Sequence, residues 1–136
     1  MATLVLTDAY VSINSVDLSD HVKSVSIDYS AEMLDDTAMG DTTKSNKGGL
    51  KDWGMKIDFH QDYAASKVDA TMFPLVGSTF TVIVRPVNTG GVSATNPNYT
   101  ATGILESYNP VGGGVGELAG ASISIKPAGA LSRATA

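Results

Sequence analysis

The chain has 136 residues, of which 43% are hydrophobic, a formal net charge of −5 and no cysteine. This length predicts a single domain, and the apolar content is sufficient for a packed core. The absence of cysteine excludes disulfide frameworks, thiol nucleophiles and thiolate metal sites. No stretch resembles a signal peptide or approaches 18 consecutive apolar residues, so we expect neither secretion nor a membrane span.

The charge is spread unevenly along the chain. Residues 1–68 carry eleven acids and six bases, whereas residues 69–136 carry three of each. An acidic chain without a basic stripe is poorly suited to grip nucleic acid, because phosphate contacts need Lys and Arg. Such a chain can still lie beside nucleic acid and repel it.

The N-terminal part predicts short elements. Residues 1–8 mix apolar and polar positions and are expected to be an arm or an edge strand donated to a neighbour. Residues 9–13 predict a short strand that ends in turn residues, and residues 17–21 predict a bend or a single helical turn. Because no second ligand lies near His21, we interpret it as a surface or packed histidine and not as a metal ligand.

Two alternating segments organise the whole chain. Polar and apolar residues alternate from residue 22 to 33 and again from 53 to 60, which places one set on each face of a strand. A hairpin centred near Thr43 would place Tyr29 opposite Ile57 and Ile27 opposite Phe59. The apolar residues then share one face and the polar residues share the other.

Between these strands lies an extended hairpin loop, residues 34–52. A compact domain seldom carries so long a loop unless the loop has a function, so we expect it to reach a partner. Its glycine and hydroxyl content predicts poor order in a free monomer, because ordering costs about 1–2 kcal/mol per residue. Met39 and Leu50 are its expected apolar anchors.

One helix is predicted after the hairpin. Asp62 is a candidate N-cap, apolar residues follow at spacings of three and four, and Pro74 should end the helix, which gives a span of residues 62–73. We expect Val68 and Met72 of this helix to pack on a core of hairpin residues: Tyr29, Trp53, Ile57 and Phe59.

Three further strands are predicted at residues 78–87, 99–108 and 117–126, and residues 127–136 should form a flexible C-terminus. Short strands in this number with one helix indicate a mainly β fold. We expect a single domain over residues 1–136: an antiparallel β-sandwich or barrel with one flanking α-helix and a long hairpin arm.

No motif predicts catalysis. The glycines at 112–114 and 116 do not match a phosphate-binding loop, and the aspartates at 35, 36 and 41 do not have the spacing of an EF-hand. Asp28, Glu32 and Asp58 fit a solvated strand face better than a pair of catalytic carboxylates. We therefore expect no enzyme activity, no catalytic residue, no cofactor and no metal site.

The order of elements resembles the tail tube proteins of long-tailed bacteriophages. The resemblance covers about residues 9–126, and its most suggestive piece is DTTKSNKGGLKDWGMKIDF, a polar arm that enters an aromatic-led strand. It implies a subunit that assembles into a hexameric ring with a shared inner β-barrel. Rings stack into a tube that surrounds a tape-measure protein and later conducts DNA. Related folds serve in contractile tails and type VI secretion tubes.

The resemblance implies two surfaces and a set of partners. We expect inter-ring contacts at Met39, Asp41, Lys44, Lys47 and Leu50, and a lumen lined by Ser24, Ser26, Asp28, Ser30, Glu32 and Asp58, with Lys56 on the same face. The implied partners are further copies of the chain and the tape-measure, tail-terminator and tail-tip proteins. DNA would pass without specific binding, no membrane is implied, and the location would be the virion tail after assembly in the bacterial cytoplasm.

An alternative reading is a monomeric β-sandwich binding module, such as a capsid decoration or receptor-binding protein, whose loop 34–52 contacts a receptor. Mass at moderate concentration separates rings or tubes from such a monomer.

Overall fold

A computed structural model describes residues 4–7, 9–88 and 91–135. The strands form one seven-stranded antiparallel sheet in the order β2-β1-β5-β6-β7-β4-β3. Their bounds are β1 Tyr10–Ile13, β2 Val16–Asp17, β3 Val22–Asp35, β4 Asn46–His60, β5 Thr79–Arg85, β6 Asn98–Gly112 and β7 Gly120–Ala134. The helical elements are a 3₁₀ turn η1, Ser19–His21, the helix α1, Val68–Met72, and a second 3₁₀ turn η2, Phe73–Leu75. The predicted mainly antiparallel β fold with one flanking helix is confirmed.

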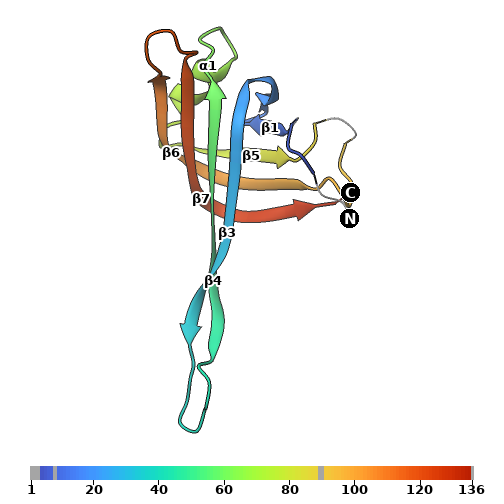
Figure 1. Ribbon diagram of the computed structural model, residues 1–136, viewed down its shortest axis with the longest axis vertical. Coiled ribbons are helices and arrows are strands. Elements are labelled where there is room, and N and C mark those ends of the chain that lie inside the picture. Colours follow the sequence, from blue (N-terminus) through green and yellow to red (C-terminus); the bar gives the residue numbers. More distant parts are fainter. Residues whose placement is uncertain (1–3, 8, 89–90, 136) are drawn as a thin grey trace.

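Strands β6 and β7 first follow the long axis of the molecule and then turn to one side, so that the sheet bends into two layers (Figure 1). Register shifts between Ala101 and Gly103 and between Leu105 and Ser107 mark this bend in β6. Such irregularities bend a strand and increase its twist. We call the four-stranded part made by β3, β4, β7 and the C-terminal half of β6 the front sheet. Strands β5, β1 and β2 lie behind it.

The core lies between the two layers and is built on β4. Side chains at alternate positions of this strand are buried: Trp53, Met55, Ile57 and Phe59. They meet the buried faces of β7 and β5, while Val68 and Met72 of α1 close one end. Fully burying a side chain of this size stabilises the fold by about 1.5–3 kcal/mol.

The hairpin has the predicted parity but a different register. The structure pairs Tyr29 with Trp53 and Ile27 with Met55, so the predicted pairs with Ile57 and Phe59 are wrong by four residues. The strands are also longer than expected. β3 continues to Asp35 and β4 begins at Asn46, which leaves residues 36–45 as the loop. Tyr29 was expected in the core, but it is 53% exposed because its position lies beyond the second layer.

The predicted helix over residues 62–73 is wrong in its first half. Ser66 has a φ of 62°, which an α-helix cannot contain, and α1 begins only at Val68. Asp62 caps a turn instead, because its Oδ1 accepts a hydrogen bond from the backbone N–H of Ala64 at 2.9 Å. The stretch nevertheless supplies the two core residues expected of it.

The two ends of the chain can also be compared with their predicted structures. Residues 127–134 were expected to be flexible, but they belong to β7 and pair with β6 as far as Asn98 opposite Ala134. Of the predicted N-terminal arm, residues 4–7 are not in a strand, and residues 1–3 and 8 lie outside the described residues.

We predict that Phe59→Ala lowers the free energy of unfolding by about 3–5 kcal/mol, because Phe59 is fully buried and its removal leaves a cavity. Tyr29→Ala is the matched control on the same hairpin, and its effect should be far smaller because Tyr29 is largely exposed. Chemical denaturation of both variants measures the difference. Equal losses would show that the core does not depend on the buried face of β4.

Candidate assembly surfaces

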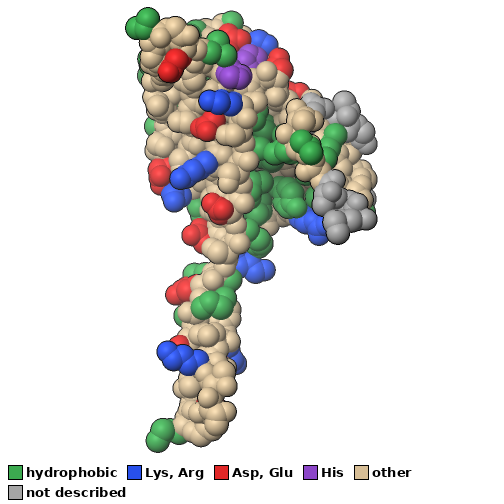
Figure 2. All heavy atoms as spheres, in the orientation of Figure 1, with side chains coloured by type: hydrophobic (Ala, Val, Ile, Leu, Met, Phe, Trp, Pro, Cys, Tyr) green, Lys and Arg blue, Asp and Glu red, His purple; other side chains and the backbone are tan. Residues whose placement is uncertain are grey.

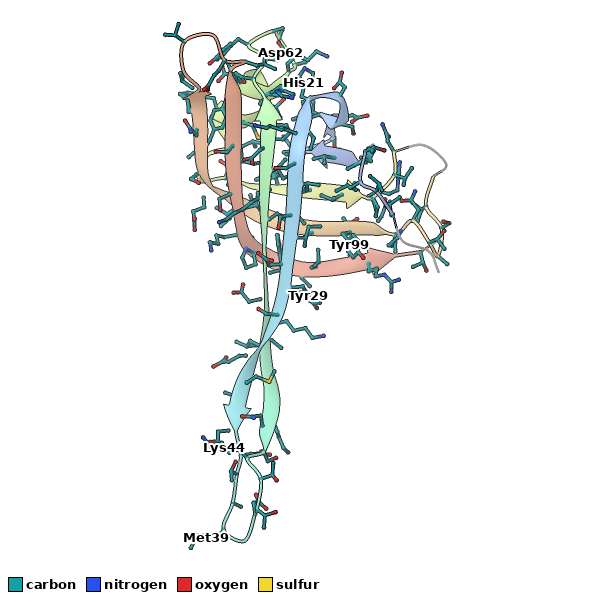
Figure 3. All side chains as sticks on the ribbon, viewed as in Figure 1. His21, Tyr29, Met39, Lys44, Asp62 and Tyr99 are labelled. Atoms are coloured by element: carbon teal, nitrogen blue, oxygen red, sulfur yellow. The ribbon has the colours of Figure 1, made fainter. Side chains whose placement is uncertain are left out.

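The hairpin projects far beyond the two layers. We call residues 31–51 the arm, since Ala31 and Lys51 form the last regular pair before a register shift. Figure 3 shows the strands crossing just beyond Tyr29 and running to a loop that carries Met39 at its end. The arm is a two-stranded ribbon with no layer packed on it, and such a ribbon is only marginally stable in water.

Apolar side chains project from the arm into solvent. Met39 and Leu50 are 102% and 82% exposed, and the sequence analysis had named both. Met33 and Leu34 are also exposed on the arm, but neither was predicted as an anchor. Met33 was assigned to the apolar face of the first strand, and Leu34 was not singled out within loop 34–52. Asp41 and Lys44 lie in the loop and Lys47 pairs opposite Leu34, so the arm carries all five predicted inter-ring residues.

The loop at the end of the arm is held by its own hydrogen bonds. The backbone N–H of Asp36 donates to the carbonyl of Ser45 at 3.0 Å, and Asp41 Oδ2 accepts from the N–H of Ala38 at 2.8 Å. Asp35 accepts from Thr37 N–H at 2.9 Å, and hydrogen bonds from the Thr37 side chain and backbone lower the pKa of Asp35. Asp35 and Asp41 therefore serve the loop backbone, and no metal-binding group of three or more such side chains is found among the described residues.

The outward face of the front sheet is polar (Figure 2). Ser24, Ser26, Asp28 and Ser30 on β3 lie opposite Asp58, Lys56, Gly54 and Asp52 on β4, and the Ser24 hydroxyl donates to Asp58 Oδ2 at 3.0 Å. Ser122 and Ser124 of β7 extend the same face. Five of the six predicted lumen residues thus share one surface. The sixth, Glu32, lies on the arm at the register shift between Ala31 and Met33.

This face carries both signs of charge. Lys126 Nζ lies 4.0 Å from Glu106 Oε2, and Lys23 lies at the bulge beside the Ser24–Asp58 pair. The face therefore carries four acids and three bases. The acids are Asp28, Asp52, Asp58 and Glu106, and the bases are Lys23, Lys56 and Lys126. Of these bases, only Lys56 was predicted on this face, because the position of Lys126 on β7 and the bulge at Lys23 depend on the tertiary structure.

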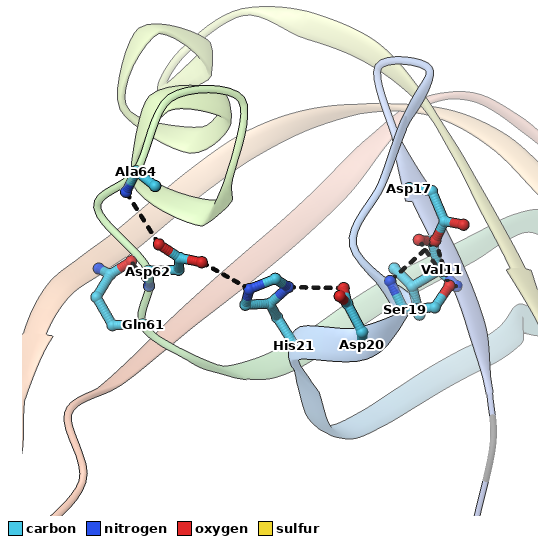
Figure 4. Close-up of polar contacts among 8 residues, drawn as sticks. All are labelled: Val11, Asp17, Ser19, Asp20, His21, Gln61, Asp62 and Ala64. Atoms are coloured by element: carbon cyan, nitrogen blue, oxygen red, sulfur yellow. Dashed lines mark hydrogen bonds and ion pairs between the residues drawn. The ribbon is translucent and has the colours of Figure 1, made fainter.

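A histidine joins the start of β3 to the end of β4 (Figure 4). His21 Nδ1 lies 2.7 Å from Asp20 Oδ1, and its Nε2 lies 2.9 Å from Asp62 Oδ2. When protonated, His21 donates to both carboxylates. His21 is thus a packed histidine, as the sequence analysis expected.

A second polar cluster fixes α1 on β6. The Tyr108 hydroxyl donates to Asp69 Oδ1 at 2.8 Å and accepts from Gln61 Nε2 at 3.0 Å. Burial and the Asp69 carboxylate raise the pKa of Tyr108 to about 12. This cluster sets where the following turn, η2, lies beside β6.

The fold of the chain is similar to that of several solved structures. No protein-family model and no curated protein sequence matches the chain. Among solved structures, the SPP1 tail tube has a TM-score of 0.71 and 11% identity, covering 95% of this chain and 77% of that chain. A chain from the tail of an empty gene transfer agent particle with C6 symmetry has a TM-score of 0.67 and 18% identity, covering 85% of this chain and 83% of that chain. A chain from the native gene transfer agent virion has a TM-score of 0.66 and 17% identity, covering 93% and 95%.

We predict that Asp62→Asn lowers stability at neutral pH and that the difference from the parent disappears in acid. The Ala64 N–H and His21 lower the pKa of Asp62, so its contribution is present above the pKa of the unfolded chain. It is lost as the pH falls through the folded-state pKa. Denaturation of both proteins across this acid range checks the sign, and a constant difference down to the lowest pH would contradict it.

The structure contains no helix, within the residues described, that is long and apolar enough to span a bilayer. The two-layer sheet, the projecting arm and the matches to solved tails agree in one conclusion. The chain has the fold of a tail tube protein, as the resemblance in its sequence predicted.

Proposed function

We propose that the chain is a structural subunit of a tail tube, which assembles into hexameric rings that stack to form a conduit for DNA. The observation that carries this proposal is the arm. It projects from the body as a ribbon without a core, and its apolar side chains are solvent-exposed in a single copy. Apolar surface on a projecting element gains free energy when a partner covers it. We assign that partner as a subunit of the adjacent ring.

The front sheet is suited to closing a ring. Within the described residues, β3 pairs with β4 alone, and residues 106–112 of β6 pair with β7 alone. The front sheet thus has two edges without a neighbouring strand, and on β6 the Pro110 carbonyl is held by hydrogen bonds from the Gln61 and Tyr63 side chains. Edges without a neighbouring strand attract further strands. Counting along β3, β4, β7 and β6, successive strands alternate in direction. The β3 edge of one copy therefore meets the β6 edge of the next in antiparallel orientation, and repetition around an axis gives a closed barrel.

The polar face would then line the lumen. Its serine hydroxyls keep it hydrated, and it carries four acids and three bases. Figure 2 shows acidic and basic side chains interspersed on this face. A conduit must not hold phosphate, since Lys and Arg contacts repeated in every ring would retain DNA. No run of bases occurs on the described part of this face, and the slight acid excess repels DNA over about 8 Å at physiological salt. The tape-measure, tail-terminator and tail-tip proteins are the further partners of this proposal.

Replacing residues 32–50 by a two-residue Asn-Gly turn tests the arm. Ala31 and Lys51 already pair, and an Asn-Gly turn joins antiparallel strands without strain. We expect a folded protein that still forms rings but no longer stacks into tubes, as judged by negative-stain electron microscopy. Normal tubes from this variant would show that the arm is not the stacking element. A parent protein that remains monomeric at all concentrations would instead support the binding-module alternative.

Thiol labelling of assembled tubes tests the lumen assignment, since the chain has no cysteine of its own. A polymer-linked maleimide too large to enter a tube should leave Asp28→Cys unlabelled in tubes but label it in dissociated subunits. Thr81→Cys, on the exposed side of β5 in the rear layer, is the control and should react in both states. Equal labelling of position 28 in tubes and subunits would place that face outside.

A further inference from the structure

An apolar groove opens behind the free edge of β3. It is lined by Leu6, Val25, Ile27, Val84, Pro86 and Tyr99, and its volume is about 170 Å³. Figure 2 shows hydrophobic side chains in the recess between the front sheet and the rear layer on this side. A cavity of about 150 Å³ in an apolar core can bind benzene, so this groove has room for one aromatic ring.

The opposite flank of the same sheet presents an apolar projection. Phe73 in η2 and Val76 just after it are 69% and 48% exposed. Val76 forms a bridge to Leu105. Beyond Leu105, β6 pairs with β7 on one side and with no strand on the other. The Tyr108–Asp69 hydrogen bond fixes α1, and hence η2, against β6. The projection is therefore held rigidly beside the second free edge.

The register places the groove and the projection at opposite ends of one row of paired residues. Leu105 pairs with Ile125, Ile125 with Met55, and Met55 with Ile27, in one row across the front sheet. Val76 stands at the Leu105 end of this row, and Ile27 lines the groove at the other end. Both lie on the core side of the sheet, since Leu105, Ile125 and Met55 are all buried.

The charges of the two flanks permit the contact. Of the described residues that line the groove, only Arg85 is charged. Phe73 and Val76 are apolar, so their insertion brings no like charges together.

We propose that Phe73 and Val76 of each subunit insert into the groove behind β3 of its ring neighbour, and that this contact locks the lateral interface. The partner is a second copy of this chain, and the contact is head-to-tail, which closes into a ring. The inference rests on the proposed tube function and adds the residues that join one subunit to the next.

Engineered cysteines test the contact in this cysteine-free chain. In Val76→Cys/Ile27→Cys, mild oxidation should give a ladder of disulfide-linked subunits that ends at the size of the ring. A bond within one chain is excluded, because Ile27 and Val76 are four strand spacings of about 4.8 Å apart, far more than the Cα separation of about 7 Å that a disulfide tolerates. The matched control is Val76→Cys/Ser26→Cys, since Ser26 neighbours Ile27 on β3 but faces the polar side.

A ladder in the first variant and not in the control supports the contact. Rings or tubes that form without a stronger ladder in the first variant would overturn this inference and leave the tube function standing. A protein that never assembles would overturn both.

A substitution at the projection gives an independent readout. Phe73→Lys should raise the concentration needed for ring formation on the order of a hundredfold, because a charge would enter an apolar groove whose one charged residue among those described, Arg85, is also positive. Phe73→Leu should assemble nearly as the parent does. The melting temperature of the unassembled chain should hardly change in either, since Phe73 is largely exposed there. Unimpaired rings from Phe73→Lys would refute the insertion.

Discussion

Burial of one face of β4 is the constraint on which the rest of this structure depends. The strand lies between β3 and β7, and its alternate side chains are the buried centre of the core. Because side chains alternate strictly along a strand, burying Phe59, Ile57, Met55 and Trp53 forces the intervening residues outward. Those residues include Asp58 and Lys56 on the polar face. One packing requirement thus creates both the core and the surface that we assign to the lumen.

Apolar residues continue on β3 past Tyr29, at Met33 and Leu34, where no second layer is packed on the hairpin. In the body, the apolar side chains of β4 are buried; on the arm, Met33, Leu34 and Leu50 remain exposed in a single copy. Trp53 marks the boundary, and its indole N–H donates to the carbonyl of Gly129 at 2.8 Å, which fastens the base of the arm to β7. Gly103 is needed at this point, because a Cβ there would lie 2.5 Å from Ile125 Cγ2 and 3.0 Å from the Trp53 ring. The arm is rich in glycine and hydroxyl residues, but its base is held against β7 by the Trp53 hydrogen bond.

The proposed assembly would draw on the same physical effect as folding. The core of the body is buried within the chain, whereas the arm, the groove behind β3 and the projection at Phe73 present apolar surface that we propose other copies cover. In the proposed lateral contact, strand edges would set the orientation of the two copies, because backbone hydrogen bonds are directional and apolar contacts are not. The polar clusters around His21 and Tyr108 hold the ends of the sheet, so the edges and the projection keep their relative positions.

Local sequence was enough to predict most of the strands, the two faces of β4 and the position of the hairpin. Those features follow from local alternation, which Ile57 and Phe59 on one side and Asp58 on the other display directly. The order of elements also led to the fold, which the structure confirms.

The hairpin register, the short helix and the strand at the C-terminus depend on contacts between segments that are distant in the sequence. The observed pairing of Tyr29 with Trp53 and the predicted pairing of Tyr29 with Ile57 place the same side chains on each face of the hairpin. The alternation alone therefore cannot choose between these two registers. The left-handed backbone at Ser66 shortens the helix, and pairing with β6 converts residues 127–134 to strand. The groove behind β3 could not be foreseen, since its walls come from β3, β5 and β6 and meet only when the sheet bends.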